Sequence, residues 1–233
     1  TIAFNSATSA LHIACLAIGI SDKDIVWTSP ISFVASSNCA IYCGAKIDFV
    51  DIEIDSYNIC PKKLNVKLTE AKKNKLLPKA LIVVHMCGNP SNMQEIKSLA
   101  DEYGISIIED ASHALGAKYT DDLIGSCKYS DLAVFSFHPV KMITTGEGGA
   151  ITTNNKHIAN KSALLRTHGI TRELSEHLYN DNDGEWYYEQ LELGYNYRLN
   201  DMQAALGISQ LKRLDSFVST RNEIAKRYDE SLP

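Results

Sequence analysis

One lysine, Lys141, lies between two apolar segments whose patterns predict neighbouring strands. Residues 132–137 have the composition of a buried strand, and residues 150–153 predict a second strand after a glycine cluster. Those glycines permit unusual backbone angles beside Lys141. A lysine shielded from water has a lowered pKa and becomes a nucleophile that forms Schiff bases. Position alone favours the alternative of a solvated loop lysine, since most lysines are exposed.

An aspartate, Asp110, ends an apolar segment that predicts another strand of the same sheet. Groups that contact ligands in open α/β sheets gather at the carboxyl ends of the strands. A carboxylate near a Schiff-base lysine suits pyridoxal phosphate, because it holds the ring nitrogen protonated and makes the ring an electron sink. Asp110 therefore favours the chemical interpretation of Lys141.

Three motifs occur in order along the chain: Glu109-Asp-Ala-Ser-His-Ala-Leu-Gly116, Ser136-Phe-His-Pro-Val-Lys141 with Gly146-Glu-Gly-Gly149, and Gly194-Tyr-Asn-Tyr-Arg-Leu199. With them the chain resembles the DegT/DnrJ/EryC1/StrS sugar aminotransferases, which are pyridoxal-phosphate-dependent enzymes of fold type I. The resemblance extends from Phe4 to about Tyr228. Residues 28–35 and 186–199 are most similar to the transaminases of pseudaminic acid synthesis.

The resemblance implies one catalytic residue, Lys141, and a set of cofactor-binding residues: Ala7, Thr8, Phe33, Asp110, His113, Ser136, Lys141 and Asn196. Lys141 would hold pyridoxal phosphate and move a proton on the substrate carbon. Asp110 would keep the ring nitrogen protonated, Phe33 would stack on the ring, and His113 would face the ring hydroxyl.

The resemblance also implies the phosphate contacts. Ser136 and the backbone at Ala7 and Thr8 would bind the phosphate, since the start of a helix offers free N–H groups. Asn196 corresponds to a phosphate contact made from the neighbouring subunit. The resemblance therefore predicts a homodimer with shared active sites.

The implied reaction transfers an amino group from L-glutamate to C4 of a UDP-4-keto-6-deoxy-N-acetylhexosamine, and amino transfer to another 4-keto nucleotide sugar is the alternative within the family. One alternative is sugar dehydration, but in the dehydratases of this family a histidine replaces the lysine. Another alternative is a catalytically inactive α/β binding module. The presence of Lys141, Asp110 and Ser136 favours transamination over both.

Without the resemblance, several of these residues have ordinary explanations. Phe33 would be a core residue, His113 a turn histidine and Asn196 a loop residue with local hydrogen bonds. Thr8 or Ser9 would cap the helix that follows. These interpretations remain open from the sequence alone.

Strand and helix patterns alternate through residue 110, which predicts an α/β fold with a mostly parallel sheet and helices on both faces. His85, after the apolar segment 80–84, is either a pocket residue or a buried histidine with satisfied hydrogen bonds, and the second is favoured. Residues 61–75 predict a lysine-rich, solvated helix, and residues 172–184 a polar surface loop.

The chain is expected to divide at residue 200. Residues 1–200 would form the large pyridoxal-phosphate-binding domain, truncated at its N-terminus. Residues 201–233 would form one long helix, capped by Asn200 or Asp201, that leads toward a missing C-terminal small domain.

Composition excludes several classes of partner. The 233 residues are 45% hydrophobic, enough to bury a sizeable core. Acidic residues outnumber basic ones by 28 to 23, which argues against nucleic acid, and no apolar run is long enough to span a membrane. The six cysteines are dispersed and predict reduced, buried thiols in a cytoplasmic protein; the pair Cys39 and Cys43 cannot fill a zinc site.

Overall fold

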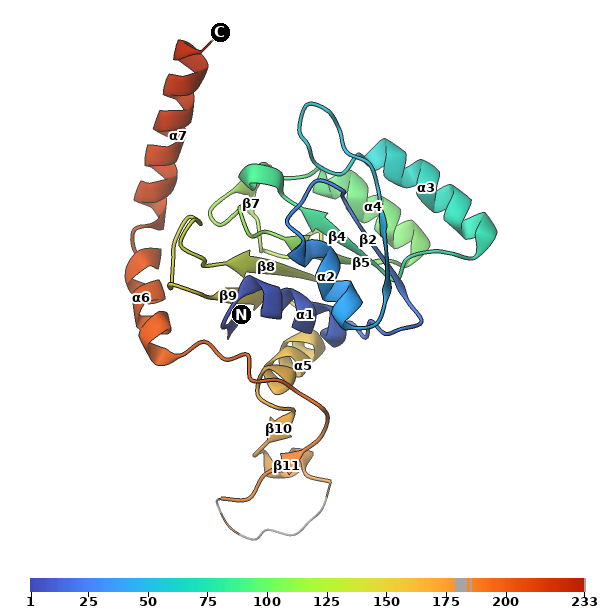
Figure 1. Cartoon of the computed structure of the whole chain (residues 1–233), viewed down its shortest axis with the longest axis vertical. Helices are drawn as coiled ribbons and strands as arrows, with labels where there is room; N and C mark the ends of the chain where they lie inside the picture. The colour runs from blue at the N-terminus through green and yellow to red at the C-terminus, as the bar shows by residue number, and fades with distance from the viewer. Residues whose placement is uncertain (179–183, 185, 233) are drawn as a thin grey trace.

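The computed structural model describes residues 1–178, 184 and 186–232, and a seven-stranded sheet lies at the centre of this part of the chain (Figure 1). Its order is β1-β9-β8-β5-β4-β2-β3. The strands are β1 Ile2–Phe4, β2 Ile25–Thr28, β3 Lys46–Phe49, β4 Ala80–Val84, β5 Ser106–Asp110, β8 Leu132–Ser136 and β9 Gly149–Thr152. The pairs from β8 to β3 are parallel, and β9 is antiparallel to both of its neighbours. The prediction of a mostly parallel sheet is confirmed.

Helices cover both faces of this sheet (Figure 1). The helices on the sheet are α1 Ala7–Ala17, α2 Ala35–Tyr42, α3 Pro61–Asn74, α4 Met93–Tyr103 and α5 Lys156–Arg166. Two further helices, α6 Asp201–Leu211 and α7 Leu214–Ser231, follow at the C-terminal end, and short 3₁₀ turns are η1 Met86–Gly88 and η2 Leu174–Glu176. On one face α1, α2 and α5 pack with Ile82 and Ile108, and on the other α3 and α4 pack with Leu81 and Ile107. This alternation along β4 and β5 follows from the two-residue period of a strand.

The central strands are apolar because both of their faces are covered. Every residue of β4 is buried, as is every residue of β8, so their side chains meet only protein. Two small two-stranded antiparallel sheets lie outside the central sheet: β6 Lys118–Tyr119 with β7 Asp122–Leu123, and β10 Ile170–Thr171 with β11 Glu189–Gln190. The loop predicted at 172–184 falls partly outside the described residues; its described start contains η2.

The prediction of one long helix after residue 200 is wrong. The segment forms two helices, α6 and α7, separated at Lys212 and Arg213. Asn200 caps α6 with a complete capping box, as predicted. Its side chain accepts from the Gln203 N–H at 2.9 Å, and the Gln203 side chain accepts from the Asn200 N–H. Figure 1 shows α7 extending beyond the sheet at the C-terminal end of the chain.

Just after the break, α7 contacts the part of the chain that carries the sheet. The start of α7 lies against Gly116, where an added Cβ would stand 3.0 Å from Val218 and 3.7 Å from Leu214. Further along α7, Arg221 donates from Nη2 to the Lys141 carbonyl oxygen at 3.4 Å. Among the described residues, none of the helices combines the length and the apolar character that crossing a bilayer requires.

Candidate active site

A cavity of about 490 Å³ opens at the carboxyl ends of β4, β5 and β8. Its lining contains seven of the eight predicted cofactor-binding residues: Ala7, Thr8, Phe33, Asp110, His113, Ser136 and Lys141. They come from segments distant in sequence, which the parallel sheet brings to one edge. The eighth, Asn196, lies outside this lining.

Lys141 lies on the connection between β8 and β9, as its flanking sequences predict. The connection is held by main-chain bonds: Phe137 N–H donates to the Gly148 oxygen at 2.9 Å, and Thr145 N–H donates to the Phe137 oxygen at 2.9 Å. The Lys141 N–H itself donates to the His138 oxygen at 2.9 Å. These bonds hold the backbone of the connection, and Lys141 lines the cavity.

Burial and neighbouring charges shift the pKa values of two residues of the cavity, Lys141 and His113. Burial lowers the pKa of Lys141, and the charge of Asp110 opposes this lowering. Burial and the Lys141 charge also lower the pKa of His113, again against Asp110. The interpretation of Lys141 as an ordinary solvated loop lysine does not fit this partly buried position.

Asp110 ends β5 and is 5% exposed. Its Oδ1 accepts from the Ser112 hydroxyl at 2.6 Å and from the Ser112 N–H at 3.1 Å. Its Oδ2 accepts from the Ser36 hydroxyl at 2.6 Å. Neither serine was predicted from the sequence. An aspartate followed two residues later by serine is a common turn pattern and would have identified Ser112, whereas no local pattern identifies Ser36.

The first turn of α1 forms another wall of the cavity. Its cap is Ser6, whose Oγ accepts from the Ser9 N–H at 3.1 Å, so the prediction of Thr8 or Ser9 as the cap is wrong. Ser9 is buried and donates to Asn5 Oδ1 at 2.6 Å. The N–H groups of Ala7 and Thr8 have no acceptor within the helix and are suited to an anion.

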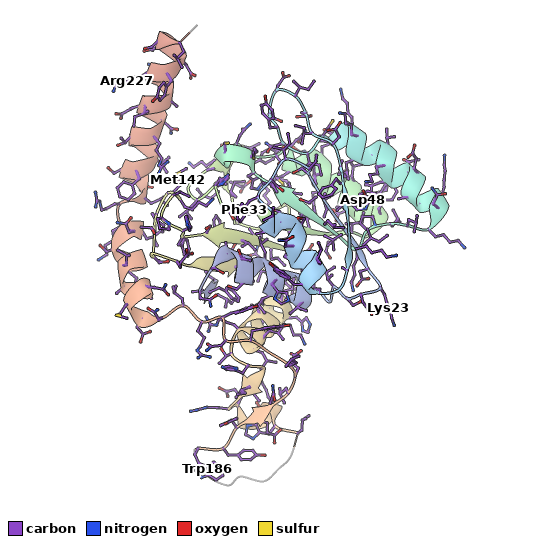
Figure 2. The ribbon with its side chains drawn as sticks, in the orientation of Figure 1. Lys23, Phe33, Asp48, Met142, Trp186 and Arg227 are labelled. Carbon is purple, nitrogen blue, oxygen red and sulfur yellow. The ribbon has the colours of Figure 1, made fainter. Side chains whose placement is uncertain are left out.

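The remaining lining residues complete a site for a flat ring. Phe33 precedes α2 and is 71% exposed, so it is a cavity residue and not a core residue (Figure 2). Ser136 ends β8 beside the α1 terminus, where Gly149 of β9 approaches so closely that a Cβ would stand 2.6 Å from the Ala7 nitrogen. Met86, His138 and Glu147 also line the cavity, although the sequence analysis did not include them.

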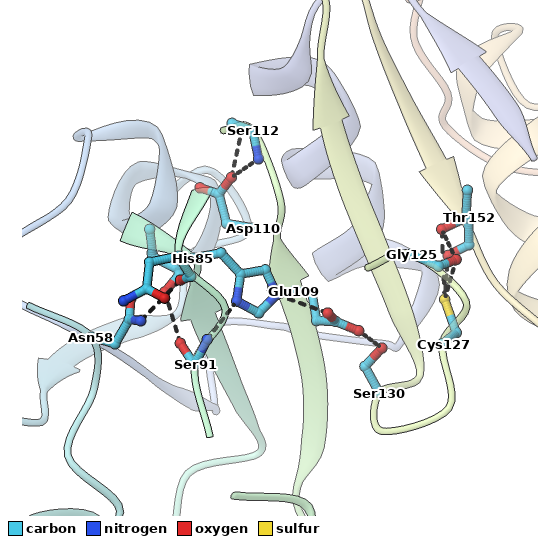
Figure 3. Close-up of polar contacts among 12 residues, drawn as sticks. Asn58, His85, Ser91, Glu109, Asp110, Ser112, Gly125, Cys127, Ser130 and Thr152 are labelled. Atoms are coloured by element: carbon cyan, nitrogen blue, oxygen red, sulfur yellow. Dashed lines mark hydrogen bonds and ion pairs between the residues drawn. The ribbon is translucent and has the colours of Figure 1, made fainter. Parts of the chain in front are cut away.

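A buried polar network lies on the opposite face of β5 from Asp110 (Figure 3). His85 Nδ1 accepts from the Ser91 N–H at 3.1 Å, so Nε2 carries the proton and donates to Glu109 Oε2 at 2.8 Å. The Ser130 hydroxyl donates to the other oxygen of Glu109. The prediction that His85 is a buried histidine with satisfied hydrogen bonds is confirmed.

Asn196 lies on the segment that follows β11. It is exposed, pairs with Thr167 as an isolated bridge, and accepts at its carbonyl oxygen from Asn5 Nδ2 at 3.5 Å. Because Asn196 is absent from the cavity lining of its own chain, the predicted phosphate contact from a neighbouring subunit stays a prediction.

The cysteines are free thiols, and their burial differs from one to another. All six cysteines are unbridged; Cys87 is exposed and Cys43 partly buried, so the prediction that all are buried is wrong for these two. In the part of the chain that the structure describes, no three histidine, cysteine or acidic side chains are grouped to hold a metal ion.

The donor set of the cavity fits pyridoxal phosphate. Helix N–H groups and a hydroxyl suit the phosphate, a carboxylate suits the ring nitrogen, an amine suits the aldehyde, and an aromatic side chain suits the ring face. The cavity volume lies within the range of about 300–1,000 Å³ usual for small-molecule sites.

Curated relatives carry aminotransferase names. The chain is 48% identical over 228 residues to the UDP-4-amino-4,6-dideoxy-N-acetyl-β-L-altrosamine transaminase of Campylobacter jejuni. The matched region covers 98% of this chain and 56% of that protein. The chain thus spans about half the length of the curated relatives it matches.

Solved aminotransferase structures share the fold. Helicobacter pylori PseC, an aminotransferase of pseudoaminic acid biosynthesis, superposes with a TM-score of 0.82 at 35% identity, over 98% of this chain and 57% of that chain. A putative sugar aminotransferase of Streptococcus pneumoniae, in its PMP form, has a TM-score of 0.85 at 27% identity, over 98% of this chain and 60% of that chain. The fold-type I prediction and the narrower resemblance to the pseudaminic acid transaminases are both confirmed.

The family model of the DegT/DnrJ/EryC1/StrS aminotransferases matches residues 1–233, the whole of the chain. The aminotransferases of this family are pyridoxal-phosphate-dependent. The motifs, the cavity and these relatives agree, and the chain belongs to the DegT/DnrJ/EryC1/StrS aminotransferase family.

Proposed function

We propose that this protein is a pyridoxal-phosphate-dependent sugar-nucleotide aminotransferase that moves an amino group from L-glutamate to C4 of a UDP-4-keto-6-deoxy-N-acetylhexosamine. The observation that carries the proposal is the convergence of the Lys141 amine, the Asp110 carboxylate and the start of α1 on one cavity. The sugar is proposed from the named activity of the Campylobacter jejuni relative.

Each residue of the cavity has a role in holding the cofactor. The N–H groups of Ala7 and Thr8 and the Ser136 hydroxyl would bind the phosphate, and Phe33 would stack on the ring. Asp110 would accept from the ring nitrogen, and His113 would face the ring hydroxyl. Bound pyridoxal phosphate supplies an aldehyde that accepts the amino group and a ring that stabilises negative charge on the substrate carbon.

Lys141 would have two tasks. Its amine holds the cofactor until an amino substrate replaces it. The displaced amine would then move a proton between the substrate carbon and C4′ of the cofactor. To accept this proton, the amine must be neutral near the working pH. Burial lowers the pKa of Lys141 and so supports this role.

The alternatives named from the sequence receive less support. Dehydratases of this family carry a histidine where Lys141 stands, and Lys141 lies in the cavity. An inactive binding module has no need for a lysine, an aspartate with three donors and a helix start in one cavity.

We propose further that the active protein is a homodimer in which Asn196 completes the phosphate site of the neighbouring subunit, and that it acts in the cytoplasm. The exposure of Asn196, outside the cavity of its own chain, supports the shared site.

The experiment that tests the proposed function uses the full-length protein loaded with pyridoxal phosphate. It is incubated with L-glutamate and a UDP-4-keto-6-deoxy-N-acetylhexosamine, and mass spectrometry follows the nucleotide sugar. We expect a 4-amino sugar together with an equal amount of 2-oxoglutarate, and neither product when the 4-keto group is reduced to an alcohol. Loss of the C3 hydroxyl without nitrogen gain would show a dehydratase, and no turnover with any 4-keto UDP-sugar would contradict the proposal.

A further inference from the structure

The hydroxyl of Ser36 donates to Asp110 across a separation of 74 residues. Ser36 is the second residue of α2 and is fully buried, and its Oγ lies 2.6 Å from Asp110 Oδ2. It does not line the cavity, whereas Ser112, the other serine bonded to Asp110, does. Ser36 can therefore reach a cavity ligand only through the Asp110 carboxylate.

The two oxygens of Asp110 have different hydrogen-bond donors. Oδ1 takes a main-chain N–H, from Ser112, and this donor cannot reverse its direction. A proton on the carboxylate would therefore bind to Oδ2, the oxygen to which Ser36 donates. A hydrogen bond donated to a carboxylate stabilises its ionised form over its protonated form.

The position of the proton between Asp110 and the ring nitrogen decides how well the cofactor withdraws electrons. A proton shared between Asp110 and a ring nitrogen lies either on the nitrogen, opposite an ionised carboxylate, or on the carboxylate, opposite a neutral ring. Only the protonated ring is an efficient electron sink. A donor on Oδ2 favours the first arrangement.

We propose that Ser36 is a positioning residue for the reaction: its hydroxyl keeps the Asp110 carboxylate ionised and aimed into the cavity, and thereby keeps the ring nitrogen of bound pyridoxal phosphate protonated. This inference rests on the proposed function, because it requires that cofactor in the cavity.

The test measures the ring nitrogen directly. Full-length protein is loaded with pyridoxal phosphate labelled with ¹⁵N in the ring, and the ¹⁵N chemical shift, which separates the protonated from the neutral ring, is followed against pH. Ser36→Ala removes the donor, and Ser36→Thr restores a hydroxyl. Ser162→Ala is the control, because Ser162 is also fully buried in a helix and its hydroxyl has no hydrogen-bond partner among the described residues.

In Ser36→Ala we expect the ring nitrogen to lose its proton at lower pH than in the wild type, and kcat to fall by roughly tenfold to a hundredfold, the effect of one hydrogen bond to a charged group. Ser36→Thr should recover most of the shift, and Ser162→Ala should leave both measurements unchanged. A loss of stability alone would lower the amount of folded enzyme without moving the nitrogen titration.

Two results separate failure of this inference from failure of the proposed function. If wild type binds the cofactor with a protonated nitrogen and Ser36→Ala titrates identically, the role of Ser36 is wrong and the proposed function stands. If wild type does not bind pyridoxal phosphate, the proposed function itself fails. If Ser36→Ala does not fold, Ser36→Cys replaces it, because a thiol is close in size to a hydroxyl but is a weak donor. The same decrease in the pH at which the ring nitrogen loses its proton is then expected.

Discussion

Gly88 lies so close to His113 that no side chain fits between them: a Cβ at position 88 would stand 2.6 Å from the His113 carbonyl oxygen. Gly88 also has a φ of 84°, in the left-handed region that favours glycine. It belongs to η1, which follows β4 and contributes Met86 to the cavity lining. The position of His113 therefore depends on the turn after β4.

Gly88→Ala is expected to move His113 and to weaken cofactor binding as well as stability. Strain at positive φ costs about 1–2 kcal/mol, and the clash adds to this. Gly104→Ala is the matched control, because Gly104 has a φ of 68° and nothing within 4 Å of an added Cβ. Denaturant unfolding and pyridoxal phosphate titration measure the two effects. Equal cofactor affinity in both variants would show that the Gly88 contact does not position the site.

The charge of Asp110 acts on the pKa of Lys141, and the sign of this effect can be tested. Asp110 raises the pKa of Lys141 against the lowering by burial, so Asp110→Asn should lower that pKa further. Competitive acetylation of the cofactor-free protein, read by mass spectrometry against pH, reports the neutral fraction of each lysine. The exposed Lys128 is the control: its pKa is raised by its hydrogen bond to Asp122, and it should titrate above Lys141 in both proteins. A higher Lys141 pKa in Asp110→Asn than in the wild type would contradict this prediction.

The network of His85 and Glu109 predicts a stability effect that leaves the cavity chemistry alone. Both oxygens of Glu109 accept hydrogen bonds, from His85 and from Ser130. Glu109→Gln turns one acceptor into a donor that faces another donor, which should lower the free energy of unfolding by about 1–3 kcal/mol. The exposed Glu70→Gln should change it by less than about 0.5 kcal/mol. Chemical denaturation compares the two, and equal stabilities would mean that the assigned proton positions are wrong.

The cavity residues on strand ends could be predicted from the sequence. Apolar runs predict the buried strands, and a parallel sheet gathers their carboxyl ends, so Asp110 was expected at that edge. Ser136 was expected only from the family resemblance. The connection that carries Lys141 followed from the strands on either side of it.

Contacts that depend on tertiary packing could not be predicted. Ser36 is a serine inside an ordinary helix, and only the packing of α2 against β5 brings it to Asp110. Small polar residues around the start of α1 include several possible caps, and because α1 begins at Ala7, Ser6 holds the cap position. No proline or glycine stands at the break between α6 and α7, so the sequence does not predict it. The start of α7 after the break lies against Gly116 through Leu214 and Val218.

The proposed shared site predicts complementation between two inactive proteins. Full-length Lys141→Ala and Asn196→Ala chains are mixed under conditions that exchange subunits, and activity is measured in verified mixed dimers. One site of such a dimer has an intact lysine and an intact partner asparagine, so activity should return when Asn196→Ala alone is severely impaired. Verified mixed dimers without activity would leave Asn196 as a residue of its own chain.

The covalent role of Lys141 is the central claim and has the most direct test. Full-length protein is treated with pyridoxal phosphate, reduced with borohydride and digested, and the peptides are mapped by mass spectrometry. The reduced cofactor should be found on Lys141, and Lys141→Ala should fold normally but carry no label, because a loop lysine contributes little to the core. Labelling of another lysine in place of Lys141, or no labelling of the wild-type protein, would contradict the assignment.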